Sequence, residues 1–297
     1  MEFLRFLSQY RLPPLDVLFQ FITVLAQETV IVAVICWLYW CADKRLAYTL
    51  GFSFFASGLC VQGLKITFRI PRPWVLDPDF KPVASALSGA TGYSFPSGHT
   101  QSATSLLSTL CFSTHRKRLR ILCIAGFLAV GFSRMYLGVH TPKDVCVSMA
   151  VTLVLSALSY ALFGRIADDH SKDLIVSIIL IAVSAGLLVY AQSLHSSGVI
   201  ELEYAMDCFK SGGAGLAFAV GFCLERRFVN FSLPQEFKTR ILRFAAGMAV
   251  TLVLQIGLRF LFPDTLFFGA LRYFLLVFWI LVLYPCIFMK LFSQKPS

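Results

Sequence analysis

The sequence is poor in charged residues. Only 14% of its 297 residues are Asp, Glu, Lys or Arg, whereas a soluble domain usually carries about 25%. Hydrophobic residues make up 57% of the chain and occur in long blocks. The length alone would suggest two soluble domains of about 150 residues each. The apolar blocks override that reading and indicate a polytopic membrane protein.

Paired cysteine motifs are also absent. The chain has nine cysteines, but none form a C-x-x-C pair and most lie within apolar blocks. A free cysteine in such a position behaves as a small buried hydrophobic residue. We therefore expect neither a disulfide framework nor a zinc site.

Acidic residues are outnumbered by basic ones, 16 to 26, which gives a net charge of +10. In a soluble protein this excess would suggest nucleic acid as a partner. Here the basic residues lie in short loops between apolar blocks, and no basic surface interleaved with aromatic residues is evident. Orientation in a membrane explains the excess better, and we expect no binding of nucleic acid.

Nine apolar segments are candidates for membrane-spanning helices, each of which needs roughly 20 residues. The third is short and rich in Ser and Thr, so it must be packed among other helices. The chain start, 1–16, lacks the order of a signal peptide and suits an amphipathic helix at the interface. We place the nine helices at residues 17–40, 46–69, 98–114, 119–137, 143–163, 174–192, 206–224, 240–262 and 266–289.

Two features within these segments need interpretation. Glu28 lies in the middle of the first segment. It is either a functional carboxylate within the membrane or the start of a helix after a break, with 14–26 lying oblique, and both interpretations stay open. Gly212, Gly213 and Gly215 are not followed by the Lys-Ser/Thr of a phosphate loop, so we expect them to serve helix packing.

The basic loops all fall on one side if the nine helices alternate in direction. These are the loops after the first, third, fifth and seventh helices. By the positive-inside rule this side is cytoplasmic. The 70–97 loop, the 138–142 turn and the 193–205 loop fall on the opposite side.

Three motifs rich in ionisable residues lie on that opposite side. They are "KITFRIPRP" at 65–73, "PSGHT" at 96–100 and "SRMYLGVHTPKD" at 133–144. The second motif begins the third helix and the third motif ends the fourth, so both return to the face where the second helix ends. All three motifs can therefore meet.

Several residues of these motifs suit the binding of a phosphate. Lys65, Arg72 and Arg134 supply three cations for phosphate oxygens, and the planar fork of arginine matches two oxygens at once. Ser97 and Gly98 begin the third helix, where free backbone N–H groups and the helix dipole face an anion. The glycine also permits close approach of the backbone.

Two histidines and an aspartate suit the cleavage of a phosphate ester. His140 is a candidate nucleophile, and Asp144 would orient its ring and favour the imidazolium. His99 is a candidate general acid for the leaving group. Thr141 to Asp144 also reads as a helix start, with Thr as the N-cap and an acid at the third position. Both roles of Asp144 can hold at once.

Read as Lys-x6-Arg-Pro, Pro-Ser-Gly-His and Ser-Arg-x5-His-x3-Asp, the three motifs together resemble the signature of the type-2 phosphatidic acid phosphatase superfamily. The resemblance covers about 65–145 and the surrounding helices. It implies that His140 forms a phosphohistidine, that His99 protonates the leaving group, and that no metal or other cofactor takes part.

The resemblance also implies a fold. We expect an all-α, polytopic membrane helical bundle, with a six-helix phosphatase core and about three additional C-terminal transmembrane helices. The chain then divides into an interfacial segment at 1–16, a catalytic core at 17–173 and the additional helices at 174–297. The additional helices could shape substrate access, form the face of a homodimer or only pad the fold.

We therefore expect a metal-independent membrane phosphatase acting on a lipid phosphate or diphosphate. The substrate stays open among undecaprenyl diphosphate, phosphatidic acid, phosphatidylglycerophosphate and a sphingoid phosphate. We expect the protein in a bacterial cell membrane, with its active site on the extracytoplasmic face. The alternatives are a phosphotransferase of the same mechanism, and a non-enzymatic phospholipid transporter or scaffold that would not need both histidines.

Overall fold

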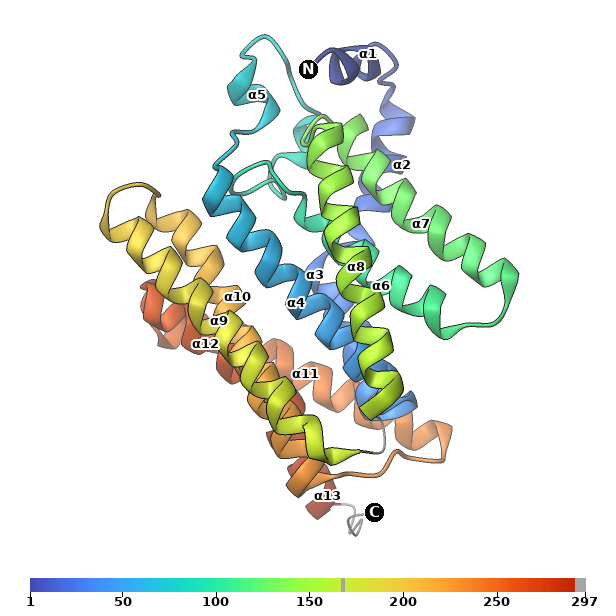
Figure 1. Ribbon diagram of the computed structural model, residues 1–297. Helices are drawn as coiled ribbons and strands as arrows, with labels where there is room; N and C mark the ends of the chain where they lie inside the picture. The colour runs from blue at the N-terminus through green and yellow to red at the C-terminus, as the bar shows by residue number, and fades with distance from the viewer. Residues whose placement is uncertain (167–168, 292–297) are drawn as a thin grey trace.

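The protein is a bundle of helices (Figure 1). The computed structural model describes residues 1–166 and 169–291, and every regular element in these two ranges is helical. The first part of the chain contains α1 (Glu2–Ser8), α2 (Pro13–Val24), α3 (Glu28–Trp37), the π-helical η1 (Leu38–Ala42), α4 (Lys44–Phe68), α5 (Pro73–Leu76), the 3₁₀ turn η2 (Ala84–Ala86), α6 (Gly98–Ser113), α7 (Lys117–Tyr136) and α8 (Pro142–Ile166).

The rest of the described chain is built in the same way. It contains η3 (His170–Lys172), α9 (Asp173–Ser196), α10 (Leu202–Leu224), the π-helical η4 (Glu225–Val229), α11 (Phe237–Leu261), α12 (Leu266–Phe278), the π-helical η5 (Trp279–Leu283) and α13 (Tyr284–Leu291). The predicted core and the predicted additional helices each include a few residues outside the described ranges, namely 167–168 and 292–297.

Six of the helices are long and apolar enough to cross a membrane, and the bent pair of α2 and α3–η1 makes a seventh candidate. Each of the nine predicted segments contains a helix, but α6 and α10 fall short of this criterion. The reason for α6 is its length of 16 residues. The first half of α10 carries the charged residues Glu203, Asp207 and Lys210. The fold is thus the predicted polytopic helical bundle.

The first predicted span is broken rather than straight. Helix α2 ends at Val24, α3 begins at Glu28, and the two are bent by 43°. Gln27 is extended and precedes the first turn of α3. Of the two interpretations of Glu28, the geometry confirms the helix start after a break, and Glu28 also faces a cavity that is described below.

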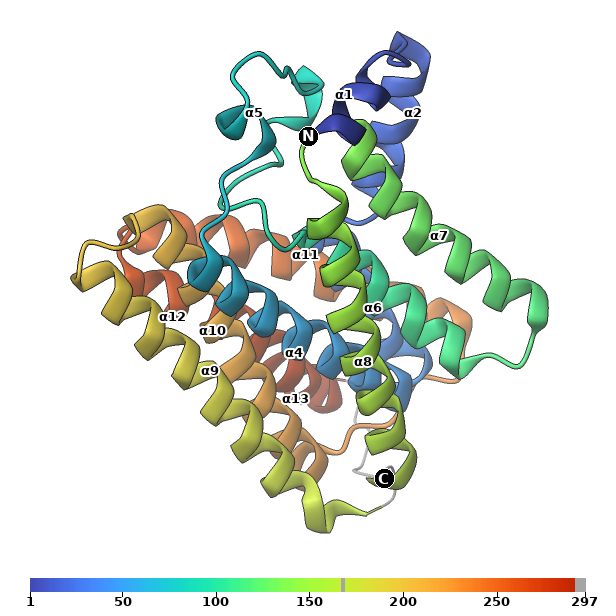
Figure 2. The same cartoon turned by 45° about the horizontal axis from the view of Figure 1, so that its top comes forward.

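Helix α4 lies at the centre of the bundle and packs against α6, α8, α9 and α10 (Figures 1 and 2). Small polar side chains line its contacts with α6 and α8. The Ser53 hydroxyl lies 2.8 Å from that of Ser105 on α6 and 2.6 Å from that of Ser156 on α8. These hydrogen bonds let the short, Ser- and Thr-rich α6 pack among other helices, as its composition predicts.

The C-terminal helices form a second group, in which α10 packs closely against α9 and α12 (Figure 2). Glycines on α10 make this approach possible. A Cβ atom on Gly213 would lie 2.1 Å from the backbone oxygen of Ala270 on α12, and one on Gly212 would lie 2.5 Å from Leu188 on α9. The predicted packing role of these glycines is confirmed.

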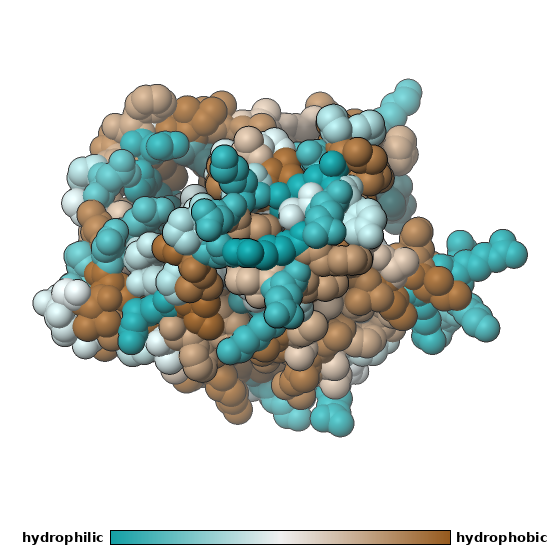
Figure 3. Space-filling model, turned by 90° about the horizontal axis from the view of Figure 1, so that it is seen from above, coloured by the Kyte–Doolittle hydropathy of each residue, from teal (hydrophilic) through white to brown (hydrophobic). Residues whose placement is uncertain are grey.

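Two opposite ends of the bundle differ in chemistry. At one end, Lys44 pairs with the buried Glu225 at 2.6 Å and Arg226 pairs with Asp173 at 2.9 Å, which brings together the starts of α4 and α9 and the end of α10. The other end carries α1, α5 and the loop around them, and hydrophilic side chains gather on this face (Figure 3). There Tyr93 stacks on Tyr204 with ring centroids 4.0 Å apart.

Candidate active site

The three motifs meet at the end of the bundle that carries α1 and α5. Lys65 lies in the last turn of α4, and Arg72 immediately precedes α5. Ser97 is the N-cap of α6, where its hydroxyl accepts a hydrogen bond from the backbone N–H of Thr100 at 3.4 Å. Three further motif residues come from the junction of α7 and α8. Arg134 lies in the last turn of α7, His140 in the turn between the helices and Asp144 in the first turn of α8.

Five of the eight predicted site residues line one cavity of about 310 Å³. They are Lys65, Arg72, Gly98, His99 and His140. The other three are buried and do not line it, and they are Ser97, Arg134 and Asp144. The cavity therefore presents two cations, both histidines and the start of α6 to a ligand, and the remaining predicted residues can act on it from behind.

His140 is held at its Nε2 atom by Arg72. The Nη1 atom of Arg72 lies 2.9 Å from this nitrogen and also donates to the carbonyl oxygen of Val139 at 3.1 Å. The rest of the guanidinium donates to the carbonyl oxygens of Gly92, at 2.9 Å, and Thr91. Because a guanidinium can only donate, Nε2 accepts, and the ring proton of a neutral His140 belongs on Nδ1.

The loop that supplies these carbonyls depends on a glycine. Gly92 has a φ of +67°, a left-handed conformation that glycine adopts without the steric cost of a Cβ atom. A Cβ atom there would also lie 3.6 Å from Asp207 and 4.0 Å from Nζ of Lys65. Gly92 thus lets the loop close over Arg72 and lie beside Lys65.

Asp144 meets both predictions from the sequence, since it lies beside the His140 ring and in the first turn of α8. Its Oδ2 atom lies 3.5 Å from Nδ1 of His140 and accepts hydrogen bonds from the hydroxyl of Ser94, at 2.6 Å, and the backbone N–H of Thr141, at 2.8 Å. The backbone N–H of Asp144 in turn donates to the hydroxyl of Thr141 at 3.4 Å. This reciprocal pair is a capping box, and it fixes the carboxylate that faces the His140 ring.

The environment of His140 favours its neutral form. Burial and the neighbouring charge of Arg72 lower the pKa of His140 well below its ordinary value, and the Asp144 carboxylate, 3.5 Å from Nδ1, opposes them only in part. A neutral ring with its proton on Nδ1 has an unprotonated Nε2, which is the form that a nucleophile requires.

Arg134 is the most deeply buried of the three predicted phosphate-binding cations, with 1% of its surface exposed. Its Nε and Nη2 atoms have no hydrogen-bond partner in the described part of the chain. A buried charged donor without an acceptor is costly. An anion next to Arg134 would remove that cost.

The start of α6 is tied to the third motif and has free space beside it. The backbone N–H of Ser97 donates to the carbonyl oxygen of Asp144 at 3.2 Å, and the Ser148 hydroxyl donates to the Ser97 carbonyl at 2.7 Å. A Cβ atom on Gly98 would meet nothing within 4 Å. The predicted anion site at this helix start is therefore open.

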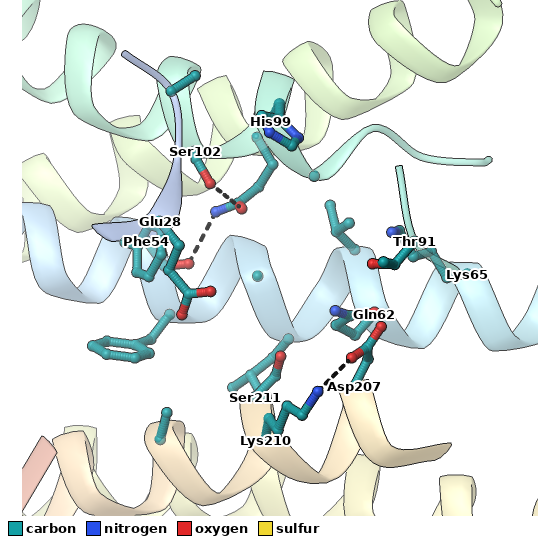
Figure 4. Close-up of a pocket in the computed structure, with 18 of the residues that line it drawn as sticks. Glu28, Phe54, Gln62, Lys65, Thr91, His99, Ser102, Asp207, Lys210 and Ser211 are labelled. Carbon is teal, nitrogen blue, oxygen red and sulfur yellow. Dashed lines mark hydrogen bonds and ion pairs between the residues drawn. The ribbon is translucent and has the colours of Figure 1, made fainter. Parts of the chain in front are cut away.

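The motifs did not predict several residues of the cavity. Glu28, Asp207, Lys210, Ser211 and Tyr273 also line it, and four of them come from α10 and α12. Figure 4 shows Glu28, Lys65, His99 and the Asp207–Lys210 pair around one open space. The sequence did carry a signal for the α10 residues. Asp207 and Lys210 are an acid and a base within the predicted membrane-spanning segment at 206–224, where ionisable residues are rare.

Two family models match the chain. A model of the PAP2 superfamily matches residues 46–168, and a model of the PAP2 superfamily phosphatase, transmembrane extension, matches residues 209–296. The chain belongs to the PAP2 superfamily. This confirms the predicted family and, with the apolar helices, shows an integral membrane protein of this superfamily. The predicted boundary at residue 173 stays a prediction.

Several named proteins are similar to this PAP2 protein. Sphingosine-1-phosphate phosphatase 2 of Mus musculus is 28% identical over 173 residues, which are 56% of this chain and 48% of that protein. Phosphatidylglycerophosphatase B of Bacillus subtilis is 34% identical over 100 residues, 29% of this chain and 46% of that protein. Undecaprenyl-diphosphatase BcrC of Bacillus subtilis is 34% identical over 114 residues, 36% and 54% of the two chains.

This PAP2 chain spans about half the length of the curated relatives it matches. Among solved structures, it is similar to the crystal structure of Aquifex aeolicus LpxE, with a TM-score of 0.49 and 27% identity, over 54% of this chain and 93% of that one.

Proposed function

We propose that the protein is a membrane phosphatase that hydrolyses a lipid phosphate or diphosphate through a phosphohistidine at His140, without a metal ion. The observation that carries this proposal is the position of His140 in the cavity. Its Nε2 atom lies 2.9 Å from Arg72, and its Nδ1 atom faces Asp144. The names of the similar phosphatases support a lipid phosphate as substrate.

In the first step, the phosphate group binds to Lys65, Arg72 and the open start of α6, with Arg134 behind. Nε2 of His140 leaves its contact with Arg72 and forms a bond to phosphorus, while the bond between phosphorus and the ester oxygen breaks. Asp144 stabilises the positive charge that develops on the ring. The cations and backbone N–H groups stabilise the charge on the phosphate oxygens in the transition state.

His99 donates its proton to the oxygen of the leaving alcohol. Burial and the charges of Arg134, Lys65 and Arg72 lower the pKa of His99, and the negative phosphate opposes these charges once it has entered. A water molecule then attacks phosphorus and returns a proton to His99, the bond between phosphorus and Nε2 breaks, and inorganic phosphate leaves.

The position of the site suits a lipid. It lies at the ends of α4, α6 and α7, so a head group can reach the cations while its hydrocarbon chain stays in the bilayer. We assign this end to the extracytoplasmic face, because the basic end with Lys44 and Arg226 is opposite and basic loops face the cytoplasm.

A bacterial cell membrane remains the expected location. The substrate remains one of the four lipid classes named above, and a homodimer remains an expectation.

Phosphate release from a panel of these four lipids tests the proposal. The purified protein in mild detergent should release phosphate from at least one of them with EDTA present. His140→Ala should abolish release, whereas His115→Ala, in an exposed loop, should retain it. Release that requires a divalent ion, or that persists in His140→Ala, would contradict the mechanism. Release that requires an added acceptor would favour a phosphotransferase.

A further inference from the structure

The cavity has a basic end and an end with a single acid. Lys65 and Arg72 lie at the motif end, and a Cβ atom on Gly92 would lie within 4.0 Å of both Lys65 and Asp207, so Asp207 belongs to this end. Lys210 pairs with Asp207 at 3.1 Å. Glu28 lies across the open space from Lys65 in Figure 4 and is the acid of the far end.

Glu28 is the group that remains available at this end. Its carboxylate has no hydrogen bond or ion pair in residues 1–166 and 169–291, and Figure 4 shows it apart from the Asp207–Lys210 pair. The side chain is exposed to the cavity, and Figure 4 shows its carboxylate directed into the space that the lining residues surround. Within a bundle of apolar helices, an unpaired carboxylate calls for a partner.

The size of the cavity limits what that partner can be. A volume of about 310 Å³ is at the lower end of the range for small-molecule sites. It can hold a phosphate together with the first few atoms of the leaving alcohol, but not a lipid chain. A group that reaches Glu28 must therefore lie close to the phosphate in the substrate.

We propose that Glu28 binds an ammonium group on the leaving alcohol and is a specificity-determining residue of this protein. The far end of the cavity, formed by Glu28, Ser211 and Tyr273 and called here the amine subsite, would make amine-bearing lipid phosphates the preferred class. The inference rests on the proposed phosphatase activity. It also assigns a role to α10 and α12. These helices would complete a binding site whose catalytic residues come from other helices and loops.

The charges support this arrangement. A substrate with a phosphate and a nearby ammonium group is zwitterionic, and it would place each charge next to its opposite in the cavity. An uncharged alcohol or amide would leave the Glu28 carboxylate without a partner, and an acidic head group would be repelled. Because Lys210 is paired with Asp207, its cation is held away from the ammonium group.

Two matched substrates test this inference, a long-chain 2-amino alcohol 1-phosphate and its N-acetyl derivative, which keeps the phosphate and the chain but loses the positive charge. The wild-type protein should have a kcat/KM for the free amine that is about tenfold or more above that for the amide, as expected for a charge-assisted hydrogen bond. Glu28→Gln should reduce this ratio to near one.

The control is Glu203→Gln. Glu203 is an acid on α10 that lines a neighbouring cavity and not the cavity of Glu28 and the motifs, so the ratio should stay at the wild-type value. Vanadate, a phosphate analogue, should inhibit Glu28→Gln as it inhibits the wild type if the phosphate site is intact.

A second measurement needs no variant. A long-chain amine without phosphate should inhibit the wild type at least about tenfold more strongly than its N-acetyl derivative. A wild-type ratio near one, equal inhibition by the two compounds, or an unchanged ratio in Glu28→Gln would overturn the amine subsite while leaving the phosphatase proposal intact. If neither lipid of this pair nor any of the panel of four released phosphate, both the amine subsite and the proposed phosphatase activity would be contradicted.

Discussion

His140 lies between a cation and a carboxylate, and burial has the largest effect on its protonation. Burial and Arg72 lower the pKa of His140 below its ordinary value of about 6.5. As the pH falls below that value, the unfolded chain binds a proton at this position and the folded chain does not, so the folded state loses stability. The same property keeps the ring nucleophilic in mild acid.

This property predicts a pH dependence of unfolding. When the pH is lowered from about 7.5 to about 5.5, the melting temperature of the wild type should fall further than that of His140→Gln. His115→Gln, which changes an exposed histidine, should follow the wild type. Thermal unfolding in detergent measures all three. Parallel pH dependences of the wild type and His140→Gln would show that His140 is not held neutral.

The buried, unpaired guanidinium of Arg134 predicts a role in binding an anion rather than in stabilising the fold. Its Nε and Nη2 atoms are buried without partners in the described chain, and replacement of such a charge by an apolar side chain of similar size is often neutral or stabilising. Arg134→Met should therefore reduce kcat/KM by about 100-fold or more while leaving the melting temperature of the ligand-free protein unchanged or raised.

The matched control for Arg134→Met is Arg69→Met, which removes an exposed arginine outside the motif positions. It should retain activity. Vanadate should raise the melting temperature of the wild type and of Arg69→Met. The rise for Arg134→Met should be much smaller. Near-normal activity of Arg134→Met would show that Arg134 does not bind the phosphate.

At the scale of residues, the sequence predicted which side chains come together but not how they are held. The order and spacing of the motifs were enough to predict that Lys65 and His140 lie close together. Each motif is local in the sequence, and the alternating direction of the helices brings the motifs to one face. Ser94 and the carbonyl of Gly92 could not be predicted, since their contacts depend on the path of a long loop. Glu28 was recognised as unusual, but its place in the cavity depends on the bend between α2 and α3.

At the scale of elements, the packing of α10 against α12 brings Lys210 and Ser211 to the cavity, and it tolerates no side chain at Gly213. Gly213→Ala should lower the free energy of unfolding by about 1–3 kcal/mol, because the new Cβ atom would overlap backbone atoms of Ala270. Activity should fall with it, since α10 must shift.

Gly186→Ala is the matched control. A Cβ atom at this position on α9 would meet nothing within 4 Å, so the substitution should be neutral or slightly stabilising by its better helix propensity. The melting temperatures and phosphate release of the two variants can be compared directly. Equal effects of the two substitutions would mean that α10 and α12 are not in close contact.

The helices themselves could be predicted from hydropathy to within a few residues. The predicted 266–289 corresponds to α12, η5 and α13, and the predicted 98–114 to α6. The break at Glu28 was left open because hydropathy reports apolar content and not direction. The packing of α9 and α12 around α10 also lies beyond a single sequence, because it depends on which faces meet.

At the scale of the whole molecule, the separation of the basic end from the motif end predicts the orientation in the membrane. A reporter that is active only in the cytoplasm should be silent when fused after Ser196, near the motif end, and active when fused after Arg116, in the basic loop between α6 and α7. The opposite pattern would place the site on the cytoplasmic face and would contradict its proposed extracytoplasmic position.

The central claim is that the phosphoryl group passes through His140, which makes the reaction a double displacement. The most direct measurement is the stereochemical course at phosphorus, with an isotopically chiral lipid phosphate hydrolysed in labelled water. Two successive in-line displacements, one by Nε2 of His140 and one by water, predict overall retention of configuration. Inversion would show a single direct attack by water and would contradict the phosphohistidine.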